Sequence, residues 1–496
     1  MKPRYAPCRA IALFACAGLA SADGPGEPDP AVPGQIIVRL AATADIDAFV
    51  AQCQADHPAL NLGLTVVNAI GSESTYLLEF DPSGLSEAQL TQLEYDLQDG
   101  YLGTYLTWGG FAYVAQGPEG GTGNIWFFVP TNGPDLFPAQ FAAATLGLND
   151  AHLTSTGQGT VVAVLDTGID ATHPQLQGRV LAGGYNFIDN NGNTADVGNG
   201  VDDDGDGLVD ELVGHGTFVA SLVTLVAPDA RILPVRVLNG DGVGSDWSVA
   251  LGIQYAIDHG VEVINLSLSS THESEIIEEA VERAADLGIV TVSAAGNFGT
   301  DTPQFPAVES PVLGVAAVDE QDVKASFSSY NEDLTIAAPG ANANPGQPDP
   351  LHSIIGALPG GMYGMWEGTS FATALVSGGA ALLRAQHPEW PNDAVSVSEI
   401  ADTIEEILRE TSVNIDGLNT IFADQLGEGR MDLAEAVTAG PSAPTPGDLD
   451  NDGSIGILDF LAMLADWNLT HSSADLDGDG TVGILDFLIL LGNWSV

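Results

Sequence analysis

Residues 161–170 read VVAVLDTGID, an apolar run of strand length that ends on Asp166. A carboxylate at the end of a buried strand is costly unless a partner meets it. Residues 131–440 alternate strand-like runs at 160–165, 231–237, 261–267 and 289–293 with helical patterns near 216–226, 246–258 and 273–287. This alternation predicts an α/β fold with a doubly wound, mostly parallel sheet. In such a sheet the chemistry lies at the carboxyl ends of the strands.

Two further segments each place one polar residue among small or apolar neighbours. GHGTFVA puts His215 at the start of an apolar helix, between glycines that leave room for an approaching group. GTSFATALVSG puts Ser370 at another helix start, where the N–H groups and the helix dipole favour negative charge. Acyl transfer needs a hydroxyl, an imidazole, a carboxylate and donors for the oxyanion. Separate roles as a strand cap, a turn residue and a helix N-cap do not explain the ordered set, so we predict a triad of Asp166, His215 and Ser370.

The order Asp, His, Ser with these flanking residues resembles the subtilases, the subtilisin-like serine peptidases. The resemblance implies that Asp166 orients the base, that His215 acts as general base and then acid, and that Ser370 is the nucleophile. It also implies that Asn297, in SAAGNFG, donates to the oxyanion together with the Ser370 backbone N–H. The resemblance further implies two strands that clamp an extended peptide, with these substrate-binding residues: Gly242, Val243, Gly244, Ser267, Leu268, Ser269 and Gly296.

One departure from the subtilase pattern leaves alternatives open. Ala374 stands where relatives have proline four residues after the nucleophile, so peptide ligation through the same acyl-enzyme stays chemically possible. A catalytically silent scaffold that acts through the C-terminal segment is the other alternative.

The C-terminal segment contains a tandem repeat. GDLDNDGSIGILDFL from Gly447 recurs as ADLDGDGTVGILDFL from Ala474. Oxygen side chains fall at the spacing of an EF-hand-like loop, which predicts Ca²⁺. The predicted ligands are Asp448, Asp450, Asp452, Ser454 and Asp459 in the first copy, and Asp475, Asp477, Asp479, Thr481 and Asp486 in the second. The repeat resembles a type I dockerin, which implies a cohesin-like partner; a calcium-stapled tail or a surface-retention module is an equal alternative.

A third acidic cluster precedes His215. It consists of Asp202, Asp204, Asp206 and Asp210, but Val213 occupies the position that would close an EF-hand-like loop. A calcium site and a solvated acidic turn both remain open for this loop.

Composition bounds the location and partners of the protein. The 496 residues carry 67 acidic and 12 basic side chains, so nucleic acid and anionic lipid are poor partners. A basic start, an apolar run too short to span a membrane and Ala20-Ser21-Ala22 predict a signal peptide over 1–22 and a secreted or extracellular protein, with association with the cell surface as the alternative. Cys53 is then the single remaining cysteine, and its helical spacing predicts a core position.

We therefore predict five regions. Residues 1–22 are a signal peptide, 23–130 a prodomain, 131–440 the catalytic domain, 441–446 a Pro-rich linker and 447–496 a small α-helical calcium-loop module. The β-α-β-β-α-β pattern of 23–130 suits a small α+β, ferredoxin-like fold. The region lies where subtilases carry a prodomain, so the resemblance implies an inhibitor that is removed on maturation, and the expected substrate is an extended polypeptide.

Overall fold

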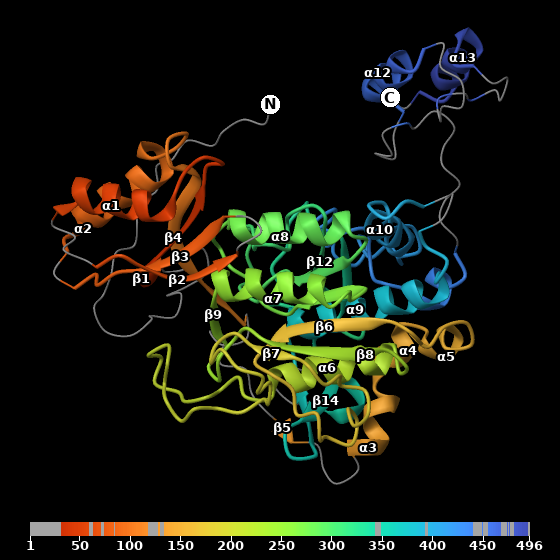
Figure 1. Cartoon of the computed structure of the whole chain (residues 1–496). Coiled ribbons are helices and arrows are strands. Elements are labelled where there is room, and N and C mark those ends of the chain that lie inside the picture. Colours follow the sequence, from red (N-terminus) through yellow and green to blue (C-terminus); the bar gives the residue numbers. More distant parts are fainter. Residues whose placement is uncertain are drawn as a thin grey trace. The chain divides into compact units, whose positions relative to one another are not determined.

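The computed structural model (Figure 1) describes part of the chain and divides it into two compact units, Met1–Thr438 and Ala439–Val496. The described residues are 31–58, 63–70, 74–83, 85–117, 127–128, 133–342, 349–391, 395–439, 449, 455–467, 474, 476 and 481–494. The predicted signal peptide and the Pro-rich linker lie outside the described residues. Among the described residues, no helix combines the length and the apolar composition that crossing a membrane requires.

A seven-stranded parallel sheet forms the centre of the first unit (Figure 1). Its spatial order is β13 (Ile336–Pro339), β12 (Val312–Val318), β11 (Val290–Ala294), β10 (Val263–Leu266), β6 (Val161–Asp166), β8 (Arg231–Arg236) and β7 (Tyr185–Asn186). The chain runs from β6 to β8 on one side and then returns to the other side of β6 as β10. The reversal lies at β6 and β10, and ligands of open α/β sheets bind beyond the carboxyl ends of the strands at such a position.

Helices cover both faces of this sheet. On one face α7 (Asp246–Asp258) packs against α8 (Glu275–Asp286), and on the other α6 (His215–Val226) packs against α9 (Thr369–Gln386). The predicted parallel α/β sheet is confirmed, and the strands and helices predicted within 160–293 lie within two residues of the observed ones.

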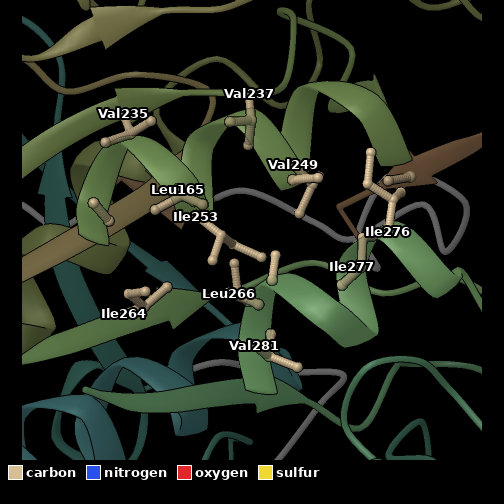
Figure 2. Packing of buried hydrophobic residues seen from close by; sticks show 14 of the residues in the cluster. Leu165, Val235, Val237, Val249, Ile253, Ile264, Leu266, Ile276, Ile277 and Val281 are labelled. Atoms are coloured by element: carbon tan, nitrogen blue, oxygen red, sulfur yellow. The ribbon is translucent and has the colours of Figure 1, made fainter. Parts of the chain in front are cut away.

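The apolar runs of the sequence fill the layer between the sheet and α7 and α8. Alternate residues of a strand face opposite sides, so Ala163 and Leu165 of β6 face this layer. Figure 2 shows Val249 and Ile253 of α7 packing with Leu165 against the sheet. Val162 and Val164, which point the other way, are also buried, and this is why the run is apolar without alternation.

Shorter elements complete the first unit. β14 (Ile354–Leu358) pairs antiparallel with β15 (Met362–Trp366), which pairs with β5 (Phe127–Phe128). The remaining helices are α3 (Gly133–Leu136), α4 (Phe141–Thr145), α5 (Leu148–Ala151), α10 (Ile400–Glu410) and α11 (Leu433–Ala436), with 3₁₀ turns at 137–139 and 350–352.

The N-terminal region forms a second, antiparallel sheet with two helices. Its elements are β1 (Ala31–Leu40), α1 (Ile46–Asp56), β2 (Thr65–Ile70), β3 (Thr75–Glu79), α2 (Glu87–Tyr95, continued as a π-helix over 96–100) and β4 (Leu106–Gln116). The strands lie in the order β2-β3-β1-β4. Cys53 is 1% exposed among Phe49, Leu90 and Leu93, and burial raises the pKa of its thiol to about 11. The predicted core role of Cys53 is confirmed.

In the second unit, the two copies of the repeat each contain a helix. These are α12 (Ile457–Ala465) and α13 (Ile484–Gly492). Met463 and Leu490 are buried in a small shared core, and the rings of Phe460 and Phe487 lie 5.2 Å apart. The helices thus pack through the same positions of the repeat.

Candidate active site

The carboxylate and the imidazole of the predicted triad meet where β6 ends and α6 begins. His215 Nδ1 lies 2.8 Å from Asp166 Oδ1 and 3.0 Å from Oδ2, and both side chains are 0% exposed. A second donor, the Thr167 N–H, bonds Asp166 Oδ1 at 2.7 Å. Neutral imidazole that donates from Nδ1 carries its lone pair on Nε2, which is the form required of a general base.

The start of α6 approaches β6 so closely that it requires glycine. A Cβ on Gly216 would lie 2.2 Å from the Gly168 carbonyl oxygen and 2.9 Å from Asp166 Oδ1. Gly214, at φ +102°, supplies the left-handed turn that leads into the helix. The two glycines around His215 therefore bring the backbone of α6 against Asp166.

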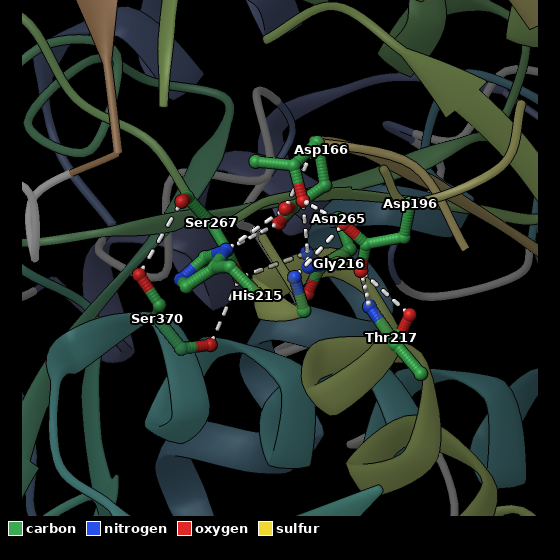
Figure 3. A network of polar contacts seen from close by, with 10 residues as sticks. Asp166, Asp196, His215, Gly216, Thr217, Asn265, Ser267 and Ser370 are labelled. Carbon is green, nitrogen blue, oxygen red and sulfur yellow. Dashed lines mark hydrogen bonds and ion pairs between the residues drawn. The ribbon is translucent and has the colours of Figure 1, made fainter. Parts of the chain in front are cut away.

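Ser370 lies at the start of α9 on the other side of His215. In Figure 3 the imidazole lies between Asp166 and Ser370, and the ring of Phe371, the next residue, is 5.6 Å from the imidazole. Ser370 Oγ donates to the Ser267 carbonyl oxygen at 3.3 Å, and Ser267 Oγ donates to the Ser370 carbonyl oxygen at 2.9 Å. The segment that directly follows β10 thus fixes the first turn of α9.

Asn297 follows β11 and is held by the residue before Ser370. Its Oδ1 accepts the Thr369 N–H and the Thr369 Oγ1 hydroxyl, both at 2.9 Å. These two donors identify that end of the amide as oxygen, so the Nδ2 donors lie at the opposite end. The side chain is 3% exposed, and its orientation is therefore fixed.

The two predicted substrate strands bind an extended segment of the chain itself. β4 pairs antiparallel with β9 (Val243–Ser245), and Gln116 exchanges two hydrogen bonds with Ser269 at 3.3 and 3.1 Å. The Gly117 N–H donates to the Gly242 carbonyl oxygen at 2.8 Å. Gly296 is not part of this pairing, since its carbonyl oxygen accepts the Ser329 N–H. Ser370 and His215 are both 0% exposed in this arrangement.

Three of the four carboxylates predicted in the acidic loop converge. Asp202, Asp204 and Asp206 offer oxygens that all lie within 4.8 Å of one another. Asp210 is not in this group, because its carboxylate accepts the Asn199 and Gly200 N–H groups at 2.8 Å.

Two carboxylates that the sequence did not indicate join the acidic loop. Burial, opposed by a backbone hydrogen bond and reinforced by Asp241 and Asp204, raises the pKa of Glu211 to about 8. Asp241 is 1% exposed and accepts the N–H groups of Asp203 and Asp210. Asp241 lies far along the chain from the loop, and no local pattern links the two.

In the C-terminal unit, the predicted calcium ligands that the structure describes are Asp459 in the first loop and Thr481 and Asp486 in the second. Asp459 accepts the Leu449 and Gly456 N–H groups at 2.6 Å, and Asp486 accepts the Gly483 N–H at 2.6 Å. Both carboxylates are 1% exposed, whereas Thr481 is exposed. The other predicted ligands lie outside the described residues: Asp448, Asp450, Asp452, Ser454, Asp475, Asp477 and Asp479.

A buried aspartate–histidine pair, a serine at an adjacent helix start and an oriented amide, all on a parallel α/β sheet, define a serine peptidase with a subtilisin-like fold. The sequence profile of the Subtilase family (Peptidase_S8) matches residues 157–429, and the chain belongs to this family.

Individual relatives agree with this assignment. Thermitase from Thermoactinomyces vulgaris is 36% identical over 273 residues, which cover 55% of this chain and 92% of thermitase. Subtilisin BL from Lederbergia lenta is 38% identical over 246 residues, which cover 48% of this chain and 80% of that protein. The crystal structure of fervidolysin from Fervidobacterium pennivorans superposes with a TM-score of 0.61 at 23% identity and covers 86% of this chain and 64% of that one. The last comparison concerns the fold alone.

Proposed function

We propose that this subtilase is a secreted endopeptidase that hydrolyses extended polypeptides through an acyl-enzyme on Ser370. The observation that carries the proposal is the buried Asp166–His215 hydrogen bond of 2.8 Å beside the start of α9. His215 takes the proton of Ser370 Oγ as that oxygen attacks the scissile carbonyl carbon, and returns it to the leaving amine. The Ser370 N–H and Asn297 Nδ2 stabilise the oxyanion, and water then releases the acyl group.

The substrate is proposed to bind as an added β-strand. Val243–Ser245 on one side and Ser269 on the other already hold Val114 to Gln116 in this way. Main-chain hydrogen bonds of this kind hold a peptide with little dependence on its side chains. An extended or unfolded polypeptide therefore fits the groove better than a compact protein surface.

Residues 23–130 are proposed to be the inhibitory prodomain. Two observations support this role: β4 occupies the proposed substrate groove, and the strand order β2-β3-β1-β4 with two helices suits a ferredoxin-like fold. Because β4 already pairs with β9 and Ser269, where the substrate is proposed to bind, we expect this region to leave before turnover begins. Among the described residues the pairing extends to Gly117, and we expect the maturation cut between that residue and residue 130.

The decisive experiment is the Ser370→Ala variant of the full chain. We expect purified Ser370→Ala protein to keep its N-terminal region and to leave casein intact, whereas the matched control Ser398→Ala, an exposed serine, matures and cleaves casein. N-terminal processing by purified Ser370→Ala protein would contradict the proposal. A fluorophosphonate probe that fails to label the mature wild-type enzyme would favour the silent scaffold, and products formed with an added amine would favour ligation.

Calcium is proposed to bind the acidic loop. Asp202, Asp204 and Asp206 form a set of hard oxygen donors that suits Ca²⁺. Glu211 is close to Asp241, and a nearby cation would reduce the repulsion between these two carboxylates. When bound, the ion would stabilise the loop between β7 and α6. We expect Ca²⁺ to raise the melting temperature of wild-type protein more than that of Asp204→Asn, with Mg²⁺ as the control. An equal shift in both proteins would argue against this site.

The segment 447–496 is proposed to be a dockerin-like calcium module with a cohesin-like partner. Among the described residues of α12 and α13, seven apolar side chains lie outside the small core and are exposed: Ile457, Leu461, Leu464, Ile484, Leu485, Leu488 and Leu491. Exposed apolar groups at repeated positions support a protein-binding surface. Titration of a cohesin domain against the full chain, with and without Ca²⁺, tests the partner, and absence of binding with Ca²⁺ would leave the stapled tail as the better account.

A further inference from the structure

A second buried carboxylate, Asp196, lies behind the Asp166–His215 pair and is not part of the predicted triad. It belongs to the loop between β7 and α6 and is 2% exposed. Burying a carboxylate is costly unless hydrogen bonds replace its water. The contacts of Asp196 show where that compensation comes from (Figure 3).

Asp196 caps the helix that carries His215. Its Oδ2 accepts the Thr217 N–H at 3.1 Å and the Thr217 hydroxyl at 2.6 Å, and its Oδ1 accepts the Gly214 N–H at 2.9 Å. The N-cap residue of α6 is Gly214, which has no side chain to serve this purpose. A carboxylate that lies 18 residues before Gly214 in the chain therefore takes the place of the usual capping side chain. Its negative charge also suits the helix N-terminus.

The same carboxylate reaches the strand that carries Asp166. The Thr167 hydroxyl donates to Asp196 Oδ1 at 3.1 Å and accepts the Gly216 N–H at 3.1 Å. Asp196 thus bonds Thr167, which follows Asp166, and also Gly214 and Thr217, which lie before and after His215 in the chain. Its bonds therefore connect the end of β6, which carries Asp166, with the start of α6, which carries His215.

The loop around Asp196 is itself held against the sheet. Arg236, the last residue of β8, donates from one nitrogen to the carbonyl oxygens of Ala195 at 2.8 Å and Val197 at 3.0 Å. The Ile169 N–H donates to the Thr194 carbonyl oxygen at 2.8 Å. The loop that carries the carboxylate is therefore held by β8 and by the segment that follows β6, in addition to its bonds to the start of α6.

We propose that Asp196 is a positioning residue for the hydrolytic reaction, which fixes the first turn of α6 against the end of β6 so that His215 stays aligned between Asp166 and Ser370. This inference rests on the proposed function of the triad. Asp196 touches none of the reacting atoms; it acts through Thr217, Gly214 and Thr167.

Asp196→Asn tests this role with almost no change in volume. The amide nitrogen has to replace one of the two oxygens, and either choice turns a donor toward a backbone N–H, that of Gly214 or that of Thr217. Displacement of a catalytic group by about 1 Å costs on the order of 100-fold in rate. We expect kcat to fall about 10- to 100-fold and KM to stay within about twofold, because the substrate strands are untouched.

The pH profile separates positioning from a purely structural role. Burial, opposed by its hydrogen bonds to Thr217 and Gly214 and assisted by Asp166, raises the pKa of Asp196 to about 6. The charged and titratable groups that face it are Asp166 and His215, with Arg236 on the flanking carbonyls. Removing its negative charge disfavours the imidazolium, so the acid limb of kcat should move to lower pH in Asp196→Asn.

Two further sets of variants make the test decisive. Asp432→Asn is the control for the substitution itself, since the Asp432 cap of α11 accepts the Ala434 and Glu435 N–H groups on Oδ1 alone, which asparagine keeps; we expect little change in melting temperature and unchanged kcat. If Asp196→Asn does not fold, Thr217→Val and Thr167→Val each remove one hydroxyl donor and should lower kcat about 3- to 10-fold. Folded variants with wild-type kcat and an unshifted acid limb would overturn the inference. An inactive wild-type enzyme would instead refute the proposed function.

Discussion

Replacing Gly216 by alanine should damage the active site although alanine is the better helix residue. In an unhindered helix interior this change stabilises by about 1 kcal/mol. Here the new Cβ would lie 2.2 Å from the Gly168 carbonyl oxygen and 2.9 Å from Asp166 Oδ1. Relief of the first contact requires α6 and β6 to separate by about 1 Å, a strain of the kind that costs about 1–3 kcal/mol. We expect a net loss of up to about 2 kcal/mol in stability and about 100-fold in kcat.

The measurements are thermal unfolding of the full-length protein and kcat on a chromogenic peptide, normalised to active sites by fluorophosphonate titration. Gly417→Ala is the control, because a Cβ there meets nothing within 4 Å and its φ is not left-handed. That variant should match wild type in both measurements. Wild-type stability and kcat in Gly216→Ala would show that α6 and β6 are not in the close contact described above.

Two further predictions concern the oxyanion and a buried acid. Asn297→Ala should lower kcat about 10²- to 10³-fold with little change in KM, the magnitude known for loss of this donor in subtilisin itself; a kcat within threefold of wild type would exclude Asn297 from the oxyanion site. Burial, reinforced by Glu278, Glu273 and Glu282, raises the pKa of Glu309 to about 8. The folded protein then holds a proton that the unfolded chain releases near pH 4, so this contribution to stability is complete below about pH 4 and is lost as the pH rises through about 8. Glu309→Gln should flatten the decline of melting temperature between pH 5 and 8, and an unchanged slope would contradict the shifted pKa.

Much of the fold was predictable because the relevant signals are local. The apolar runs of β6 and β8 fill both faces of the sheet, so they read as strands without any knowledge of their neighbours. Cys53 was assigned to the core from helical spacing alone, and the structure agrees. The pairing of β4 with β9 was not predictable from either segment, because main-chain hydrogen bonds hold the two strands together and their side chains do not identify the partner.

The site was predictable only where chemistry and local sequence coincide. Asp166 and His215 sit in short motifs with glycine neighbours, and the structure brings them within hydrogen-bond distance. The roles of Asp196 and Asp241 could not be predicted, because a lone aspartate in a polar loop is usually a solvated turn residue. Their burial depends on residues elsewhere in the chain, such as Arg236, whose contacts exist only in the folded protein.

The chain between Asp166 and His215 contains the acidic loop, and this arrangement raises the question of what keeps the two residues aligned. Covalent continuity cannot, because the polypeptide between them makes a long excursion over residues 197–213 before it reaches α6. Alignment comes instead from bonds that bypass the excursion. Asp196, just before the excursion, accepts a hydrogen bond from Gly214, just after it. Arg236 of β8 donates to the Ala195 carbonyl oxygen and so holds the segment before the excursion against the sheet. The excursion can therefore vary in length or metal content without moving the imidazole, provided that these two anchors remain.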